Sequence, residues 1–360
     1  MGLPAQESEE AEPPSEVGAQ DDEQADSGFV PIPVVGYSPD TGVLLGGSGF
    51  YFWQPQANVT STDNNTLAAF LVYGTRGIFS ASQQATFNLA DGAYKPELGF
   101  YIGRAPSDFF GIGPDAETDD QEVYTTFSMD AEGAFLIRLL PGLYAGPVVS
   151  WIYQDMLETE DGGILETQQI TGSDEIRSGG AGGRIVRDTR SPQLYPSSGY
   201  YLSFDTVAYP RALASHDGYT RFALDYRQFV SPWEGHIFAW QGIAETVVGD
   251  APFHYLPYLG GQSELRGYTE ARYRDDVAVE AQLEYRFPIW WRFGGVLFGG
   301  AGQVAPSFGE LELAPADVAA AAGVGLRFTI EQSQNLNLRF DFAVTRDGST
   351  GFYVQFREAF

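Results

Sequence analysis

The sequence predicts an all-β protein, a sixteen-stranded antiparallel transmembrane β-barrel. Apolar and polar residues alternate with period two over most of the chain from Phe29 onward, which is the pattern of strands with two different faces. The alternating stretches run to ten or more residues, whereas strands of soluble sandwiches average about 5 to 6. The face opposite the apolar one carries charges in mid-strand, which is typical of a barrel with lipid outside and water inside.

The stretch 277–287, VAVEAQLEYRF, shows the pattern most clearly. Its Val, Leu, Tyr and Phe residues and Ala281 point one way, and Ala278, Gln282, Glu280, Glu284 and Arg286 point the other. The stretch 336–345 repeats the alternation, with Asp341 on the polar face. Glycine-rich segments at 178–183 and 293–302 indicate that something approaches the wall closely from inside.

The predicted strands can be placed in chain order, with short turns or longer loops between them. Their number is even, as a barrel with both ends of the chain on one side requires. The long segments 105–121, 157–173, 249–275 and 305–317 then fall on the outer side, and most of the short turns fall on the periplasmic side. The sixteen predicted strands are 30–38, 42–54, 65–74, 78–89, 95–104, 122–138, 142–156, 174–189, 199–210, 218–230, 236–248, 276–288, 293–304, 318–330, 335–346 and 350–360.

Composition excludes several classes of protein. The net charge of −28 over 360 residues argues against nucleic-acid binding, because no basic patch exists to neutralise phosphates. The chain has no cysteine, so it holds no disulfide and no thiolate metal site. Residues 1–28 are acidic, carry no Lys or Arg and predict a disordered tail before a barrel domain at 29–360. No secretory signal is recognisable, so we expect that it has been removed.

We predict no catalytic residues, no metal site and no cofactor. The three histidines, His216, His236 and His254, are scattered without metal-ligand spacing. Ser215-His216-Asp217 is a run of adjacent residues, whereas the members of a catalytic triad meet in space.

Three motifs resemble one family. The first motif spans 255–290, YLPYLGGQSELRGYTEARYRDDVAVEAQLEYRFPIW, and contains Leu265-Arg266-Gly267-Tyr268. The second spans 186–204 and reads VRDTRSPQLYPSSGYYLSF. The third is the terminal stretch GFYVQFREAF, which ends at Phe360. In combination they resemble the BamA/TamA superfamily of outer-membrane assembly barrels, the bacterial surface-antigen barrel domain. The resemblance covers the chain from about residue 29 and implies the outer membrane of a Gram-negative bacterium.

The resemblance also implies that the sixth extracellular loop folds into the barrel and that its arginine contacts acidic side chains on the inner wall. Glu284 and Glu280 face inward on the following strand and are the expected partners of Arg266. The family often has an inward aspartate where this chain has Gly300. Arg266 is therefore expected to lose one partner.

The family implies a role in inserting or translocating outer-membrane proteins at a weak seam between the first and last strands. The predicted seam carries Pro31 and Pro33, two residues apart on one strand, and Phe360 at the end of the other. Both prolines lack an N–H on the same edge; VPIP can also be read as a simple entry linker. No POTRA domain precedes Phe29, so we expect the barrel to act alone on outer-membrane protein clients, or with a separate periplasmic partner. The alternative is a passive pore with a preference for cations, and both readings place the protein among outer-membrane lipids.

Overall fold

The computed structural model describes residues 27–38, 42–54, 64–75, 77–168, 170–191, 195–213, 215, 218–312, 314, 318–331, 336–356 and 358–360. The first strand begins at Ser27. The predicted acidic tail at 1–28 therefore lies almost wholly outside the described residues, as do His216 and Asp217.

Sixteen strands form one antiparallel sheet, and each pairs with its neighbour along the chain except where β12 and β13 intervene between β11 and β14. This confirms the predicted number and order of strands. The strands of the sheet are β1 (Ser27–Ser38), β2 (Gly42–Trp53), β3 (Asn65–Gly74), β4 (Ile78–Thr86), β5 (Tyr94–Phe109), β6 (Glu122–Leu140), β7 (Leu143–Glu158), β8 (Ile176–Asp188), β9 (Gly199–Tyr209), β10 (Tyr219–Trp233), β11 (His236–Gly249), β14 (Val277–Trp290), β15 (Phe293–Ala305), β16 (Ala319–Glu331), β17 (Leu336–Thr345) and β18 (Thr350–Phe356).

The largest differences from the predicted boundaries lie at the ends of strands. β5 continues to Phe109, past the predicted end at residue 104. β4 stops at Thr86 because the next residues form a tight turn in which Ala90 and Asp91 have positive φ. β18 stops at Phe356, four residues before the predicted end at Phe360.

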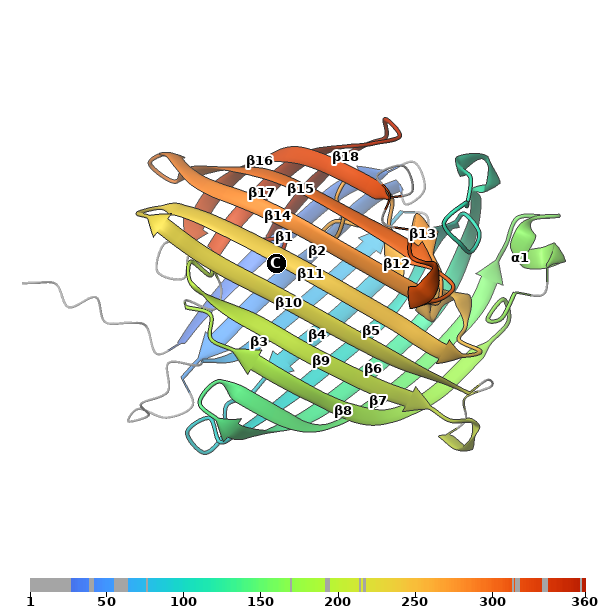
Figure 1. The fold of residues 1–360 in the computed structure, drawn as a ribbon, viewed down its shortest axis with the longest axis horizontal. Helices are drawn as coiled ribbons and strands as arrows, with labels where there is room; N and C mark the ends of the chain where they lie inside the picture. The colour runs from blue at the N-terminus through green and yellow to red at the C-terminus, as the bar shows by residue number, and fades with distance from the viewer. Residues whose placement is uncertain are drawn as a thin grey trace, which may run out of the picture.

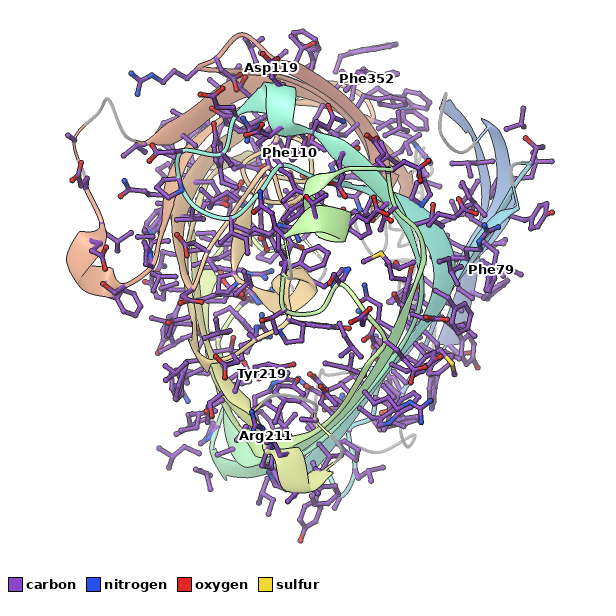
Figure 2. All side chains as sticks on the ribbon, turned by 90° about the vertical axis from the view of Figure 1, so that its right-hand side faces the viewer. Phe79, Phe110, Asp119, Arg211, Tyr219 and Phe352 are labelled. Carbon is purple, nitrogen blue, oxygen red and sulfur yellow. The ribbon has the colours of Figure 1, made fainter. Side chains whose placement is uncertain are left out.

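The sheet curls around an interior, and its strands are strongly inclined (Figure 1). Figure 2 looks into this interior from the end that carries the long loops, and many side chains point inward from the wall. Phe352 and Phe79 lie on the outside, and Tyr219 lies on the inside. Leu71 and Val149 are 61% and 60% exposed on the outer face, so the apolar half of each alternating pattern faces outward.

The long segments gather at one end of the sheet, to the right in Figure 1. They contain short elements only: α1 (Ile164–Thr167), the strands β12 (Tyr258–Leu259) and β13 (Tyr273–Arg274), and the 3-10 helices η1 (Thr118–Asp120), η2 (Arg211–Leu213), η3 (Phe253–Tyr255) and η4 (Phe308–Glu310). In the described part of the chain no helix has the length and apolar character needed to cross a membrane.

Candidate functional site

The sixth outer loop, residues 250–276, folds back into the interior. β12 and β13 pair with each other at its base, and its tip carries Leu265 and Arg266, each 1% exposed. Gly267 follows with a φ of 119°, a conformation that glycine adopts without strain. A Cβ at Gly267 would lie 2.8 Å from the Thr345 side chain on β17, so the loop fits against the wall only with glycine there.

Arg266 ends in a pocket of opposite charge. Its two terminal nitrogens each lie 2.5 Å from a carboxylate oxygen, one of Glu284 on β14 and one of Asp341 on β17. The guanidinium also stacks over the ring of Phe298, 3.6 Å from its centre. All three charged side chains are fully buried. Such burial is tolerable only because the charges are paired and hydrogen-bonded.

The pairing extends to other strands. Glu284 also accepts hydrogen bonds from Arg286, and Asp341 binds Arg327 on β16 at 2.5 Å. Glu358, beyond the end of β18, lies 2.7 Å from Arg327. We call these residues, together with Arg266, the arginine–carboxylate network. It joins the sixth loop to β14, β16, β17 and the segment after β18.

Two of the sequence-based expectations need revision at this network. Glu284 does contact Arg266, but Glu280 does not pair with it in the described structure; Glu280 accepts the N–H of Leu265 at 2.8 Å. The partner expected to be lost at Gly300 is replaced by Asp341, two strands further along the chain. Gly300 instead leaves space for Leu265, whose side chain would lie 3.4 Å from a Cβ there.

The prediction that Phe360 belongs to the seam is wrong. After β18 the chain turns into the interior, where Phe360 is 6% exposed and packs with Phe229 of β10 and with Ile237 and Ala239 of β11. Its main-chain oxygen accepts a hydrogen bond from Arg286 at 3.1 Å. The sequence predicts that Phe360 belongs to the last strand because it continues the alternating pattern, and no nearby residue predicts the inward turn. The buried cation beside its ring supplies the reason for that turn.

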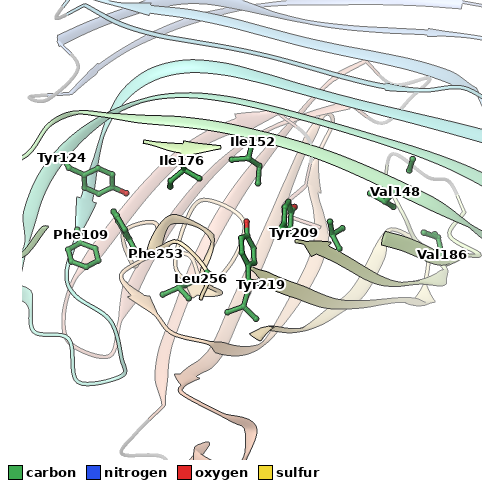
Figure 3. Close-up of a cluster of buried hydrophobic side chains, with 14 of the residues drawn as sticks. Phe109, Tyr124, Val148, Ile152, Ile176, Val186, Tyr209, Tyr219, Phe253 and Leu256 are labelled. Carbon is green, nitrogen blue, oxygen red and sulfur yellow. The ribbon is translucent and has the colours of Figure 1, made fainter. Parts of the chain in front are cut away.

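Two other outer loops pack against the base of the sixth loop. Phe253 contacts Phe109 and Tyr124 edge to face, with ring centres 4.9 Å and 5.5 Å apart, and Figure 3 shows these three rings close together. Glu122 accepts N–H groups from Ile164 and Leu165 at the start of α1. The loops at 110–121, 159–175 and 250–276 therefore form one packed cover over the outer end of the interior. The amino-acid sequence alone does not predict this cover.

Comparison with known proteins identifies the family. A model of the Omp85 superfamily domain matches residues 154–360, more than half of the chain. The chain belongs to the Omp85 superfamily. It is therefore an outer-membrane protein of a Gram-negative bacterium. No curated protein matches the sequence.

Solved structures share the fold of this Omp85 chain at low sequence identity. BamA from Haemophilus ducreyi lacking POTRA domains 1-3 matches with a TM-score of 0.58 and 14% identity over 92% of this chain and 69% of that one. CdiB from Escherichia coli matches with a TM-score of 0.56 and 11% identity, and CdiB from Acinetobacter baumannii with 0.53 and 11%. Both matches cover 92% of this chain, which spans 62% and 59% of those proteins.

The two edges of the Omp85 sheet are β1 and β18, and no ladder joins them within the described residues. β1 pairs with β2 without a break through Pro31, opposite Gly49, and Pro33, opposite Gly47. Only alternate residues of an antiparallel strand donate to a given neighbour, and proline cannot donate. The unbroken ladder therefore places both proline nitrogens on the other edge of β1, which pairs with no described strand.

Other candidate chemistry is sparse. Within the described residues no group of three His, Asp or Glu side chains could hold a metal ion. His254 lies in the cover, where burial and the nearby Arg274 hold its pKa well below the usual value. Ser215 is buried, and its neighbours in the Ser-His-Asp run lie outside the described residues.

Proposed function

We propose that this Omp85 barrel takes part in the insertion or translocation of outer-membrane proteins, and that it acts by parting the seam between β1 and β18. The observation that carries the proposal is the unpaired seam, whose β1 edge lacks two hydrogen-bond donors. An exposed strand edge is a template for the addition of another strand. The expected client is an unfolded outer-membrane β-barrel protein, and no chemistry on a substrate is involved.

The contacts inside the barrel favour a client route through the seam between β1 and β18 over a route through the interior of the barrel. The sixth loop folds into the interior and is held against the inner face of β14 and β17 by buried ion pairs. The packed cover lies at the same end, where Gly113 donates to the Arg274 carbonyl and Phe253 donates to the Thr171 carbonyl, so three loops are joined. A route between β1 and β18 requires none of these contacts to break.

The chain has no cysteine, so a disulfide can be introduced at the seam without side reactions. Single cysteines in 29–34 and in 351–355 would be combined, and the pairs that oxidise would be kept as seam locks. The control lock is Leu71→Cys with Ala81→Cys, which face each other on the hydrogen-bonded strands β3 and β4. Insertion of an unfolded eight-stranded barrel protein into liposomes is then measured before and after reduction.

We expect the seam lock to abolish the acceleration of insertion and reduction to restore it, while the control lock leaves it unchanged. Full insertion by the oxidised seam lock would refute action at the seam. Failure of the wild type to accelerate insertion would refute the assembly role itself.

A passive, cation-preferring pore is the second candidate, and the net charge of −28 favours it. It predicts a cation-selective current through wild-type protein in a planar bilayer. The buried loop predicts a small current that rises when Arg266→Ala frees the loop. A current of anions, or none in either variant, would exclude the pore.

A further inference from the structure

We infer that the interior holds a binding site for an organic polyamine, between the base of the sixth loop and the inner wall. A cavity of about 530 Å³ lies there, and a smaller one of about 160 Å³ is lined by some of the same residues, namely Arg221, Glu245 and Tyr258. The inference concerns the inner wall and stands whether or not the seam opens.

Aromatic rings line the larger cavity. Tyr209 and Tyr219 stack with ring centres 4.6 Å apart, and Figure 3 shows their side chains extending in the same direction from neighbouring strands. Further tyrosines reach the cavity from β5 and from the sixth loop. Faces of aromatic rings attract cations, and several rings around one space form a site for alkylammonium groups.

A buried polar group in this cavity lacks a partner. The two ring nitrogens of His254 are buried and make no hydrogen bond within the described residues. Leaving such groups unpaired is unfavourable. A ligand that carries N–H donors would satisfy the acceptor nitrogen of the imidazole.

Carboxylates that form no ion pair within the described residues lie in both of these neighbouring cavities. Asp130 in the larger one forms no ion pair and accepts only the hydroxyl of Tyr255, at 3.1 Å. In the smaller cavity Glu264 has neither a hydrogen bond nor an ion pair with the described residues, and Glu280 accepts only the Leu265 N–H. The one arginine present, Arg221, is already paired with Glu245 at 2.6 Å.

This arrangement fits an extended amine with a charge at each end. One ammonium group would lie near Asp130, another near Glu264 and Glu280, and the methylene chain would run past the tyrosine rings. Calcium or zinc is a poorer fit, because no three acidic or histidine side chains of the described structure converge closely enough. A neutral sugar would pack on the rings but would leave the carboxylates uncompensated.

The test uses calorimetric titration of the full chain in detergent micelles with spermidine, at about pH 8 so that Asp130 and Glu264 are ionised. About 150 mM salt screens diffuse attraction. We expect saturable binding at one site. Asp130→Asn and Glu264→Gln should each weaken it by about tenfold, because each removes a charge that faces the ligand at short range. Asp119→Asn is the matched control. It removes the same charge from the exposed η1 segment and should change affinity by less than about twofold.

Three results would overturn the inference. One is equal weakening by all three substitutions, which would show diffuse attraction to an acidic protein. The second is saturable binding of maltotriose at the same site, which would indicate a sugar site. The third is the absence of spermidine binding to wild-type protein. Folding of each variant is checked by its heat-modifiable migration in gels, so that a lost site is distinguished from a lost fold.

Discussion

The first four strands and the last five strands of this sheet are held in different ways. β1 to β4 contain no charged residue at all, and their strands are joined by backbone ladders and an apolar outer face. β14 to β18 carry the inward carboxylates and arginines that hold the sixth loop. Buried ion pairs therefore attach β14 to β18, on one side of the seam, to the sixth loop, whereas β1 to β4, on the other side, have no charged side chains for such pairs.

The difference reaches the two edge strands themselves. On β18, the hydroxyl of Tyr353 accepts the N–H of Gly267 at 2.9 Å, and Gln355 donates to Gln262 of the same loop. No described side chain of β1 has such a partner in the loop. If the seam parts, β1 to β4 have the fewest contacts to lose, so displacement should fall on that side.

Arg266→Ala should have the largest effect, because it removes the central cation that attaches the last five strands to the sixth loop. The substitution leaves Glu284 and Asp341 buried with one fewer cation, and removing one partner of a buried pair costs about 3–5 kcal/mol. We expect a loss of this size in the free energy of unfolding, measured by urea titration in lipid vesicles.

The matched control is Arg177→Ala, which removes an arginine from an exposed pair with Glu175. Exposed pairs contribute about 0–1 kcal/mol, so this variant should unfold almost as wild type does. Equal stability of the two variants would mean that the arginine–carboxylate network does not hold the C-terminal side.

A smaller loss is expected from Gly325→Ala on β16. A Cβ there would fall on the ion pair between Asp341 and Arg327, so those groups must separate or the strand must shift, at about 1–3 kcal/mol. Gly99→Ala on β5 is the control, because nothing lies within 4 Å of its Cβ position. Unfolding of both variants in urea measures the difference, and a stable Gly325→Ala would show that the network tolerates displacement.

Acidity should act on the sixth loop through Glu264. Burial, and then the nearby Glu245 and Asp225, raise the pKa of Glu264 from 4.5 to about 7. The folded state therefore retains a proton that the unfolded chain has lost, and this group's contribution to stability falls as the pH rises from about 4.5 to about 7. Arg221 and Arg227 on β10 oppose the shift.

We expect Glu264→Gln to remove roughly 1 kcal/mol of the difference in stability between pH 5 and pH 8. Urea unfolding at the two pH values checks this, with the exposed Glu175→Gln as the control. An unchanged pH dependence in Glu264→Gln would exclude Glu264 as its source.

The strands could be predicted from the sequence because each alternating residue faces either lipid or the interior, so local composition alone distinguishes the two faces. The contact of Arg266 with Glu284 could also be predicted, because the alternation gives Glu284 an inward position on the next strand. Asp341 was seen to face inward too, but its assignment to Arg266 depends on the curvature that brings β17 to the loop. The inward turn at Phe360 and the packed cover depend on contacts between segments far apart in the chain, which periodicity does not encode.

The smallest expected effect lies at the seam. Replacing Pro31 and Pro33 with valine restores two N–H donors on the edge of β1 that pairs with no described strand, and each hydrogen bond formed contributes about 0.5–1.5 kcal/mol. Amides of 351–355 should then exchange with solvent more slowly, by up to about tenfold per bond. Ile32→Val, at a position whose N–H already points toward β2, is the control and should leave exchange unchanged. If the double proline variant exchanged like wild type, the missing donors would not be what keeps the seam apart, and the freedom of β1 would have to come from its lack of contacts with the sixth loop.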